Sequence, residues 1–239
     1  MQLIFVHIPK AAGTSLKQAI VARIGETEVA FKYDRPMSDP PLIRRAKCLL
    51  ARWREPAPTQ QVVFGHFLVG KFAHLSTRGF ARRDGLRYAT FLRDPLQRAI
   101  SHYYFWQRTH LAGHKVWDRF TREKWSLERF LLSPEHTNFQ SQFLWGFALE
   151  NFDFVGLAER YEESVRLLEA TFPALAGLEV RAANTNPEKA VGSGYAIEPA
   201  LARQFRERNA QDYALYAQAT ALFDQRWQQF MSMEAHAGA

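Results

Sequence analysis

The feature that most constrains the fold is an apolar run that leads through a short glycine-containing loop into a helix. Residues 2–8 form an apolar run typical of a strand that is buried on both faces of a sheet. Pro9 ends this run, and from Ser15 the apolar residues recur at helical spacing until Gly25. The sequence therefore predicts a strand, a tight loop and a helix as its opening unit.

The same alternation of strand and helix continues along the chain. Further strands are predicted at 62–65, 88–92 and 152–157, and helices are predicted at 96–108 and 160–172. Strands that alternate with helices favour a parallel sheet. We therefore expect an α/β fold of three layers, with a central parallel sheet flanked by helices.

The length of 239 residues is compatible with a single domain over 1–239. Residues 34–61 hold several prolines around a basic helical stretch, which predicts an excursion from the core. We expect an irregular loop or hairpin at 71–87 and a helix at 137–149. The last third of the chain is predicted to be mostly helical, with C-terminal helices over 199–231.

Composition restricts the partners more than the fold. The 31 Lys and Arg residues exceed the 24 Asp and Glu residues, so the formal charge is +7, which suits an anionic partner or a phosphorylated cofactor. Cys48 is the only cysteine, so the chain has no internal disulfide. No apolar run reaches the ~18–20 residues of a membrane span. The N-terminus does not resemble a secretory signal, and we expect a cytoplasmic protein.

The loop after the first strand has the character of an anion site. Lys10 precedes Gly13, Thr14 and Ser15, and the helix begins there. The first N–H groups of a helix have no partner within the helix, and the helix dipole adds positive potential at that end. Glycine allows close backbone approach, hydroxyls add donors, and the lysine adds a full charge. A plain strand–helix turn with a surface lysine is the alternative.

This loop is P-loop-like but differs from the nucleoside triphosphate loop. In that motif a lysine and a Ser or Thr follow the last glycine, and the hydroxyl holds magnesium. Here Lys10 comes three residues before Gly13, and the sequence contains no Gly-Lys-Ser or Gly-Lys-Thr. A kinase on the same fold stays an alternative that this order of residues disfavours.

A second anion site is predicted after the strand at 88–92. Arg93 leaves the end of this strand, and Ser101 follows in the next helix. Ligands of open parallel sheets bind at the carboxyl ends of the strands, so Arg93 is expected on the same edge as Lys10. The planar guanidinium of arginine matches two phosphate oxygens. The alternative is a surface pair of Arg93 and Asp94.

Together, the two stretches "HIPKAAGTS" and "RDPLQRAISHYY" resemble the 5′-phosphosulfate loop and the 3′-phosphate motif of sulfotransferases. The chain is similar to the group of polysaccharide sulfotransferases that includes heparan sulfate 2-O-sulfotransferase, sulfotransferase family 2. The resemblance extends from residue 2 to about 187 and includes "NTNP" at 184–187.

The resemblance implies an enzyme that transfers a sulfuryl group from 3′-phosphoadenosine 5′-phosphosulfate (PAPS) to a hydroxyl, by in-line transfer and with a histidine base. It implies a carbohydrate acceptor, with anionic glycans among the candidates. The 5′ end of PAPS would lie against the loop residues, and its 3′-phosphate against the second motif. By resemblance, the cofactor-binding residues are Lys10, Ala12, Gly13, Thr14, Ser15, Arg93 and Ser101.

His66 is the predicted base, and Lys10 is the predicted catalytic cation at the leaving phosphate. His66 follows the apolar run at 62–65, so it is expected at the same sheet edge, and a histidine has a pKa suited to base catalysis. The family places its proposed base in a matching Gly-His context. A buried structural histidine is the alternative. No group of residues has the spacing of a metal site, so no metal is predicted.

Two further possibilities concern the partner. The basic and aromatic segments 71–87 and 103–125 are candidate linings for the acceptor cleft, with Lys71, Arg82 and Trp106 among the residues considered. The basic composition also fits a non-catalytic nucleic-acid binder, but the sequence contains no nucleic-acid-binding motif. We therefore expect a hydroxylated acceptor, and no nucleic acid, as the partner.

Overall fold

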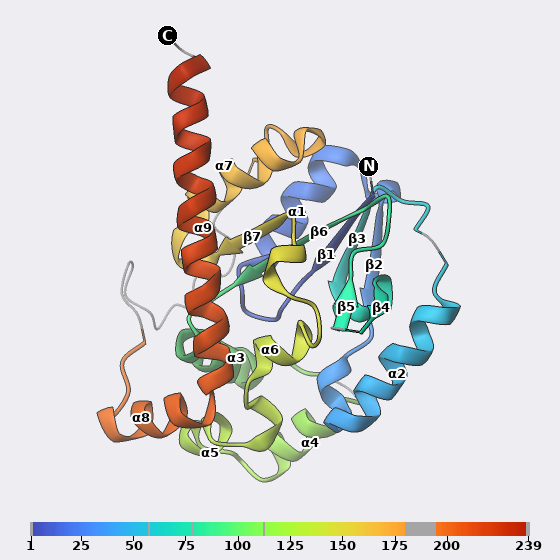
Figure 1. Ribbon diagram of the computed structural model, residues 1–239. Helices are drawn as coiled ribbons and strands as arrows, with labels where there is room; N and C mark the ends of the chain where they lie inside the picture. Colours follow the sequence, from blue (N-terminus) through green and yellow to red (C-terminus); the bar gives the residue numbers. More distant parts are fainter. Residues whose placement is uncertain (1, 57, 78, 112, 180–194, 238–239) are drawn as a thin grey trace.

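The computed structural model describes residues 2–237, except 57, 78, 112 and 180–194 (Figure 1). Arg78, in the candidate acceptor-cleft segment 71–87, and the "NTNP" stretch at 184–187 lie outside the described residues. Within the described part of the chain, five parallel strands form the main sheet in the order β2-β3-β1-β6-β7. Their bounds are β1 (Gln2–Val6), β2 (Val29–Tyr33), β3 (Val62–His66), β6 (Leu86–Leu92) and β7 (Phe154–Leu157).

The four predicted strands are confirmed, and so is the α/β class with a central parallel sheet and flanking helices. The strand β1 lies in the middle of the order, where Val6 is opposite Gly65 on one side and Thr90 on the other. The strand β2 was not predicted. It lies at the edge of the sheet, and only Val29 among its residues is fully buried, so it lacks the apolar run of the inner strands.

Helices connect the strands and flank the sheet (Figure 1). Those expected from the sequence are present as α1 (Gly13–Ile24), α2 (Pro41–Arg54), α3 (Pro95–Arg108) and α7 (Tyr161–Thr171). The C-terminal helices are α8 (Pro199–Arg208) and α9 (Ala210–Ala237). Ala219 and Phe223 of α9 are buried in the core, whereas the far end of this helix projects beyond the body of the molecule (Figure 1).

Two segments differ from the sequence-based expectation. The helix expected at 137–149 is much shorter, because α6 covers only Phe139–Phe143. The segment 71–87 contains a small antiparallel hairpin of β4 (His74–Ser76) and β5 (Gly79–Ala81), one of the two forms expected there. The remaining helices are α4 (Lys115–Arg122) and α5 (Leu127–Leu131).

The buried apolar residues form two clusters. The larger surrounds the sheet and includes Phe5, Phe64 and Phe91, whose rings stack across neighbouring strands. The smaller lies between α3, α4 and α5 and is rich in aromatic rings, among them Trp106 and Phe130. No helix among the described residues is both long and apolar enough to cross a bilayer.

Candidate functional site

The order of the strands brings the predicted site residues to one edge of the sheet. β1 lies between β3 and β6, and all three strands run in the same direction. His66 ends β3, Arg93 follows β6, and the loop that contains Lys10 follows β1. The loop therefore lies between the histidine and the arginine, as expected from the carboxyl ends of parallel strands.

A cavity of about 300 Å³ opens at this edge. All eight residues that the sequence indicated contribute to its lining: Lys10, Ala12, Gly13, Thr14, Ser15, His66, Arg93 and Ser101. The cavity thus joins the two anion sites that the sequence suggested separately. Its volume lies at the lower end of the range for small-molecule sites, roughly 300–1,000 Å³.

The loop before α1 leaves the positive end of the helix open to this cavity. Lys10 and Ala12 both have left-handed backbone conformations, with φ of 70° and 58°. No side chain caps the helix, and its first turn contains no acidic residue. Because the N-terminal end of a helix attracts anions, this end is suited to a phosphate or sulfate group.

Gly13 is needed for a contact that the sequence did not suggest. A Cβ atom on Gly13 would lie 1.9 Å from Nε2 of His7 and 2.0 Å from its Cδ2. The imidazole of His7 therefore occupies the space that any other side chain at position 13 would need. Glycine here permits close packing of β1 against the start of α1, in addition to the approach of a ligand.

Lys10 lies in a positively charged environment. Its Nζ is 4.6 Å from the centre of the Phe105 ring. Burial, together with the nearby cations of Arg93 and Arg108, lowers the pKa of Lys10 to about 8. A bound anion would offset this repulsion, so the charge distribution favours an anionic ligand.

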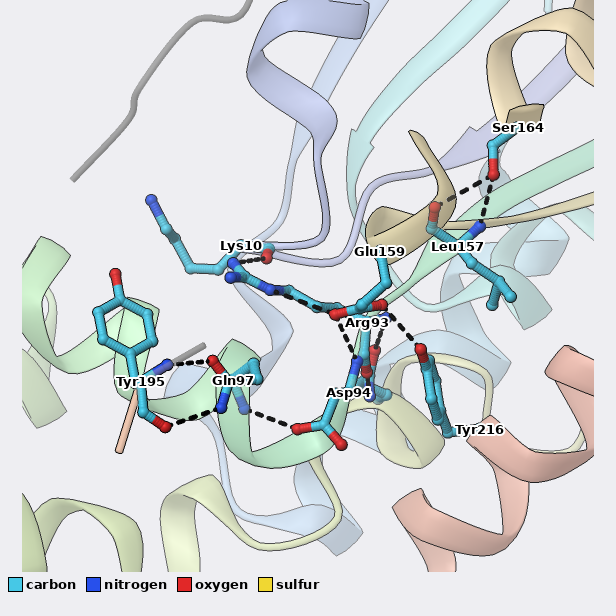
Figure 2. A network of polar contacts seen from close by, with 10 residues as sticks. Lys10, Arg93, Asp94, Gln97, Leu157, Glu159, Ser164, Tyr195 and Tyr216 are labelled. Atoms are coloured by element: carbon cyan, nitrogen blue, oxygen red, sulfur yellow. Dashed lines mark hydrogen bonds and ion pairs between the residues drawn. The ribbon is translucent and has the colours of Figure 1, made fainter. Parts of the chain in front are cut away.

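Arg93 is held in place by neighbouring polar groups (Figure 2). Its Nη1 donates to the carbonyl oxygen of Lys10 at 3.1 Å, and its Nε is 3.7 Å from Oε1 of Glu159. Oε2 of Glu159 in turn accepts a hydrogen bond from the hydroxyl of Tyr216 at 2.8 Å. The guanidinium is therefore oriented before any ligand binds, which lowers the entropic cost of binding.

The backbone of Arg93 is fixed by Gln140, whose Oε1 accepts from the Arg93 N–H at 3.0 Å and whose Nε2 donates to the Arg93 carbonyl at 2.8 Å. Gln140 depends on Asp212 of α9. The buried carboxylate of Asp212 accepts from the backbone N–H groups of Gln140, at 3.1 Å, and of Ser141, at 2.8 Å. A chain of hydrogen bonds thus links the C-terminal helix to the arginine.

His66 forms a pair with His7, with 3.1 Å between Nε2 of His66 and Nδ1 of His7. The Tyr33 ring meets His66 edge-on at 5.0 Å. Burial lowers the pKa of His66 to about 4, and the cations of Arg35 and Lys17 contribute. Burial also lowers the pKa of His7 well below its usual value. Both rings are therefore neutral at pH 7 and able to accept a proton, but the lowered pKa makes His66 a weaker base than the near-neutral histidine expected from the sequence.

The cavity has four further lining residues, His7, Pro9, Phe105 and Tyr161, none of which sequence analysis assigned to the site. Phe105 lies one helical turn after Ser101, so helical spacing was a usable signal. Tyr161 comes shortly after β7. Because ligands bind at the carboxyl ends of parallel strands, the position of Tyr161 after this strand could have identified it. Arg98, five residues after Arg93 on α3, is fully buried over the Phe139 ring at 4.2 Å, and it does not line the cavity.

Within the described residues, no group of three or more His, Cys, Asp or Glu side chains is placed to hold a metal ion. The polar groups at the cavity are cations, hydroxyls, imidazoles and a helix end. Such a set of groups suits an anion rather than a metal, since hard cations prefer oxygen ligands.

The chain is similar to a sulfotransferase from Alicyclobacillus acidocaldarius of known crystal structure, with 15% identity, coverage of 95% of this chain and 98% of that chain, and a TM-score of 0.45. None of the curated proteins matches the sequence. The model of the sulfotransferase family matches residues 1–217, nearly the whole chain. The chain therefore belongs to the sulfotransferase family, which confirms the recognition made from its two motifs.

Proposed function

We propose that this sulfotransferase uses PAPS as its donor and His66 as the base that takes the proton of an acceptor hydroxyl. The observation that supports this most directly is the single cavity in which Lys10, the open end of α1, Arg93 and Ser101 meet. A donor with anionic groups at both ends requires two anion sites within one cavity, and the lining supplies both.

The donor-binding residues fall into two groups. When bound, PAPS supplies the sulfuryl group and leaves adenosine 3′,5′-bisphosphate behind. The residues at 10–15 hold the 5′ end, because the helix end and the Lys10 ammonium favour the phosphate charge. Arg93 and Ser101 hold the 3′-phosphate, for which the guanidinium is already oriented.

The chemical step depends on a cation and a base. Lys10 stabilises the negative charge that develops on the leaving phosphate, which is the kind of preorganised electrostatic stabilisation that contributes most to catalysis. Nε2 of His66 is engaged with His7, so Nδ1 of His66 takes the acceptor proton. We assign the hydrogen of this contact to Nε2 of His66 and the acceptor role to Nδ1 of His7, which makes His7 a positioning residue that fixes the tautomer of His66.

The test is calorimetric titration with adenosine 3′,5′-bisphosphate in the presence of a magnesium chelator, together with transfer of labelled sulfate. We expect Arg93→Ala to weaken nucleotide binding. We expect His66→Ala to retain binding and to lose at least ~100-fold in turnover, the usual contribution of general base catalysis. Arg203→Ala, an exposed change on α8, is the matched control. Absence of binding heat in the wild-type protein would contradict the proposal.

The carbohydrate acceptor implied by the resemblance stays a prediction. Two of the cations expected to line its cleft have other partners. Lys71 forms ion pairs with Asp34 at 2.9 Å and Glu55 at 3.1 Å. Arg82 pairs with Asp153 at 3.0 Å. Trp106 does line a cavity next to the donor site, and the chemistry of that cavity bears on the acceptor.

A further inference from the structure

A second cavity of about 330 Å³ adjoins the donor cavity. Pro9, His66 and Phe105 line both of them, so the proposed base lies at the junction. A molecule in the second cavity would therefore contact His66 next to the donor cavity. This cavity is therefore the place where an acceptor hydroxyl can reach both the base and the sulfuryl group.

The lining of the second cavity is mainly apolar. Ten of the sixteen described residues that line it are apolar or aromatic, and rings dominate its inner part. Phe143 and Trp106 have only 1% and 3% of their surface exposed, so their positions are fixed by packing. Met37 comes from the segment expected to be an excursion from the core, and it lies on this wall.

The histidines of this wall add no charge at neutral pH. The His136 ring lies 5.1 Å from the Trp106 ring and 5.5 Å from the His102 ring. Burial, with the nearby Arg98 cation, keeps the pKa values of His102 and His136 well below the usual range. Burial also lowers the pKa of His114. All three rings behave as neutral aromatic surfaces.

The two ionised residues in the lining have opposite charges. Arg35 contributes a cation and Glu135 a carboxylate, and Glu135 forms an ion pair with Arg119. A sulfated or carboxylated glycan requires a surplus of cations along its path. Because Glu135 is already paired with Arg119, the described lining contributes one cation, Arg35, which is fewer than a polyanionic chain requires. Burial of an unpaired anion against aromatic rings is also costly. The chemistry of the wall favours an uncharged apolar ligand.

We infer that the acceptor is a compact, uncharged hydroxyl compound with an apolar ring body, which lies between Phe105, Trp106 and Phe139 and presents its hydroxyl to His66. The inference rests on the proposed function. In the transfer, the hydroxyl proton passes to His66 and the oxygen bonds to sulfur. The sulfur–oxygen bond to the 5′-phosphate breaks, and its electron pair leaves on the phosphate.

The experiment uses the full chain with labelled PAPS and three acceptors. 2-Naphthol and its saturated analogue decahydro-2-naphthol represent an aromatic and an aliphatic source of the same chemistry, and a heparan-type oligosaccharide represents the anionic glycans. We expect sulfation of one or both ring alcohols and none of the oligosaccharide. A second readout is calorimetric binding of 2-naphthol in the presence of adenosine 3′,5′-bisphosphate, which needs no turnover.

Matched variants test whether the second cavity is the site. Leu111 and Val116 are half-buried on its wall, so Leu111→Arg and, independently, Val116→Arg place a cation there. We expect either change to raise the KM for the ring alcohol at least about tenfold, because apolar contact is lost, and to leave nucleotide affinity unchanged. Leu75→Arg, at a half-exposed position on β4, is the control and is expected to change neither.

The outcomes separate this inference from the proposed function. If the nucleotide binds and the oligosaccharide alone is sulfated, or if neither ring alcohol is bound or sulfated, the inference is overturned while the donor assignment stands. An improved KM for the oligosaccharide in Leu111→Arg would also overturn it. Lack of nucleotide binding would instead contradict the proposed function.

Discussion

Because Gly13 contacts His7, the effect of Gly13→Ala on stability is expected to change sign when His7 is also replaced. Gly13 is the first residue of α1, and a Cβ atom there would overlap the His7 ring at 1.9 Å. Gly13→Ala in the wild-type background therefore forces the ring or the helix to move. In a His7→Ala background the ring is absent, and the same Cβ atom meets no such obstacle.

The expected magnitudes follow from these two environments. Overpacking of a well-packed region costs ~1–3 kcal/mol of folding free energy. For a chain of this length, that cost lowers the Tm by roughly 2–12 °C. Without the ring, replacing a helical glycine by alanine is expected to stabilise by up to ~0.5–1 kcal/mol, because the unfolded chain loses conformational freedom. The two backgrounds are then expected to differ by about 1.5–4 kcal/mol.

The assay is a double-mutant cycle, in which thermal and urea unfolding are measured for the wild-type protein, both single variants and the double variant. The coupling free energy isolates the contact between the two positions. If Gly13→Ala destabilises the protein equally in both backgrounds, the steric explanation is wrong. In that case the glycine serves only the ligand or the loop.

Three other predictions concern charge. The pKa of Lys10 is lowered to about 8, and an anion binds the protonated form of Lys10. Calorimetric affinity for the bisphosphate is therefore expected to fall as pH rises through 8, by at most about tenfold per pH unit. We expect Lys10→Met to flatten this pH dependence. The buried histidines, such as His102 and His136, have folded pKa values below the unfolded value of about 6.5. The folding free energy that depends on these neutral rings is fully present above pH 6.5. As pH falls below 6.5, each histidine reduces the stability by up to ~1.4 kcal/mol per pH unit. The Tm is therefore expected to drop between pH 7 and 5, and a constant Tm would contradict this. Asp212→Asn leaves the backbone N–H donor of Gln140 or Ser141 unpaired, which costs ~1–3 kcal/mol of folding free energy. We expect this change to weaken nucleotide binding as well. Loss of stability with unchanged affinity would show that Arg93 does not depend on Asp212.

Much of the fold could be predicted from the sequence because the inner strands are buried on both faces. β1, β3, β6 and β7 consist mostly of buried apolar residues, and such runs are visible without an alignment. β2 was missed because it is an edge strand, where partial exposure removes the apolar pattern. The helix predicted at 137–149 was too long, because the apolar residues there pack in turns as well as in α6.

The donor side of the site could also be anticipated, because its residues follow directly after strands. Lys10, His66 and Arg93 line one cavity because each follows or ends a parallel strand at its carboxyl end. The acceptor side could not be anticipated in this way. Its wall combines Met37 from the proline-rich segment with rings from α3 and α6, and their proximity depends on tertiary packing that no local pattern encodes. Gln140 and Asp212, which support Arg93, were missed for the same reason.

The hydrogen bonds from Asp212 through Gln140 to Arg93 have a consequence for biosynthesis. A ribosome releases the phosphate-binding loop and the sheet strands long before α9, since translation runs from residue 1 upward. A nascent chain that still lacks α9 would contain every proposed nucleotide ligand but not the carboxylate that anchors their scaffold. Tight capture of the proposed nucleotide is therefore expected to begin only once α9 has been made and Asp212 has bonded to Gln140 and Ser141, so that a late segment of the chain completes a pocket whose loop is made early.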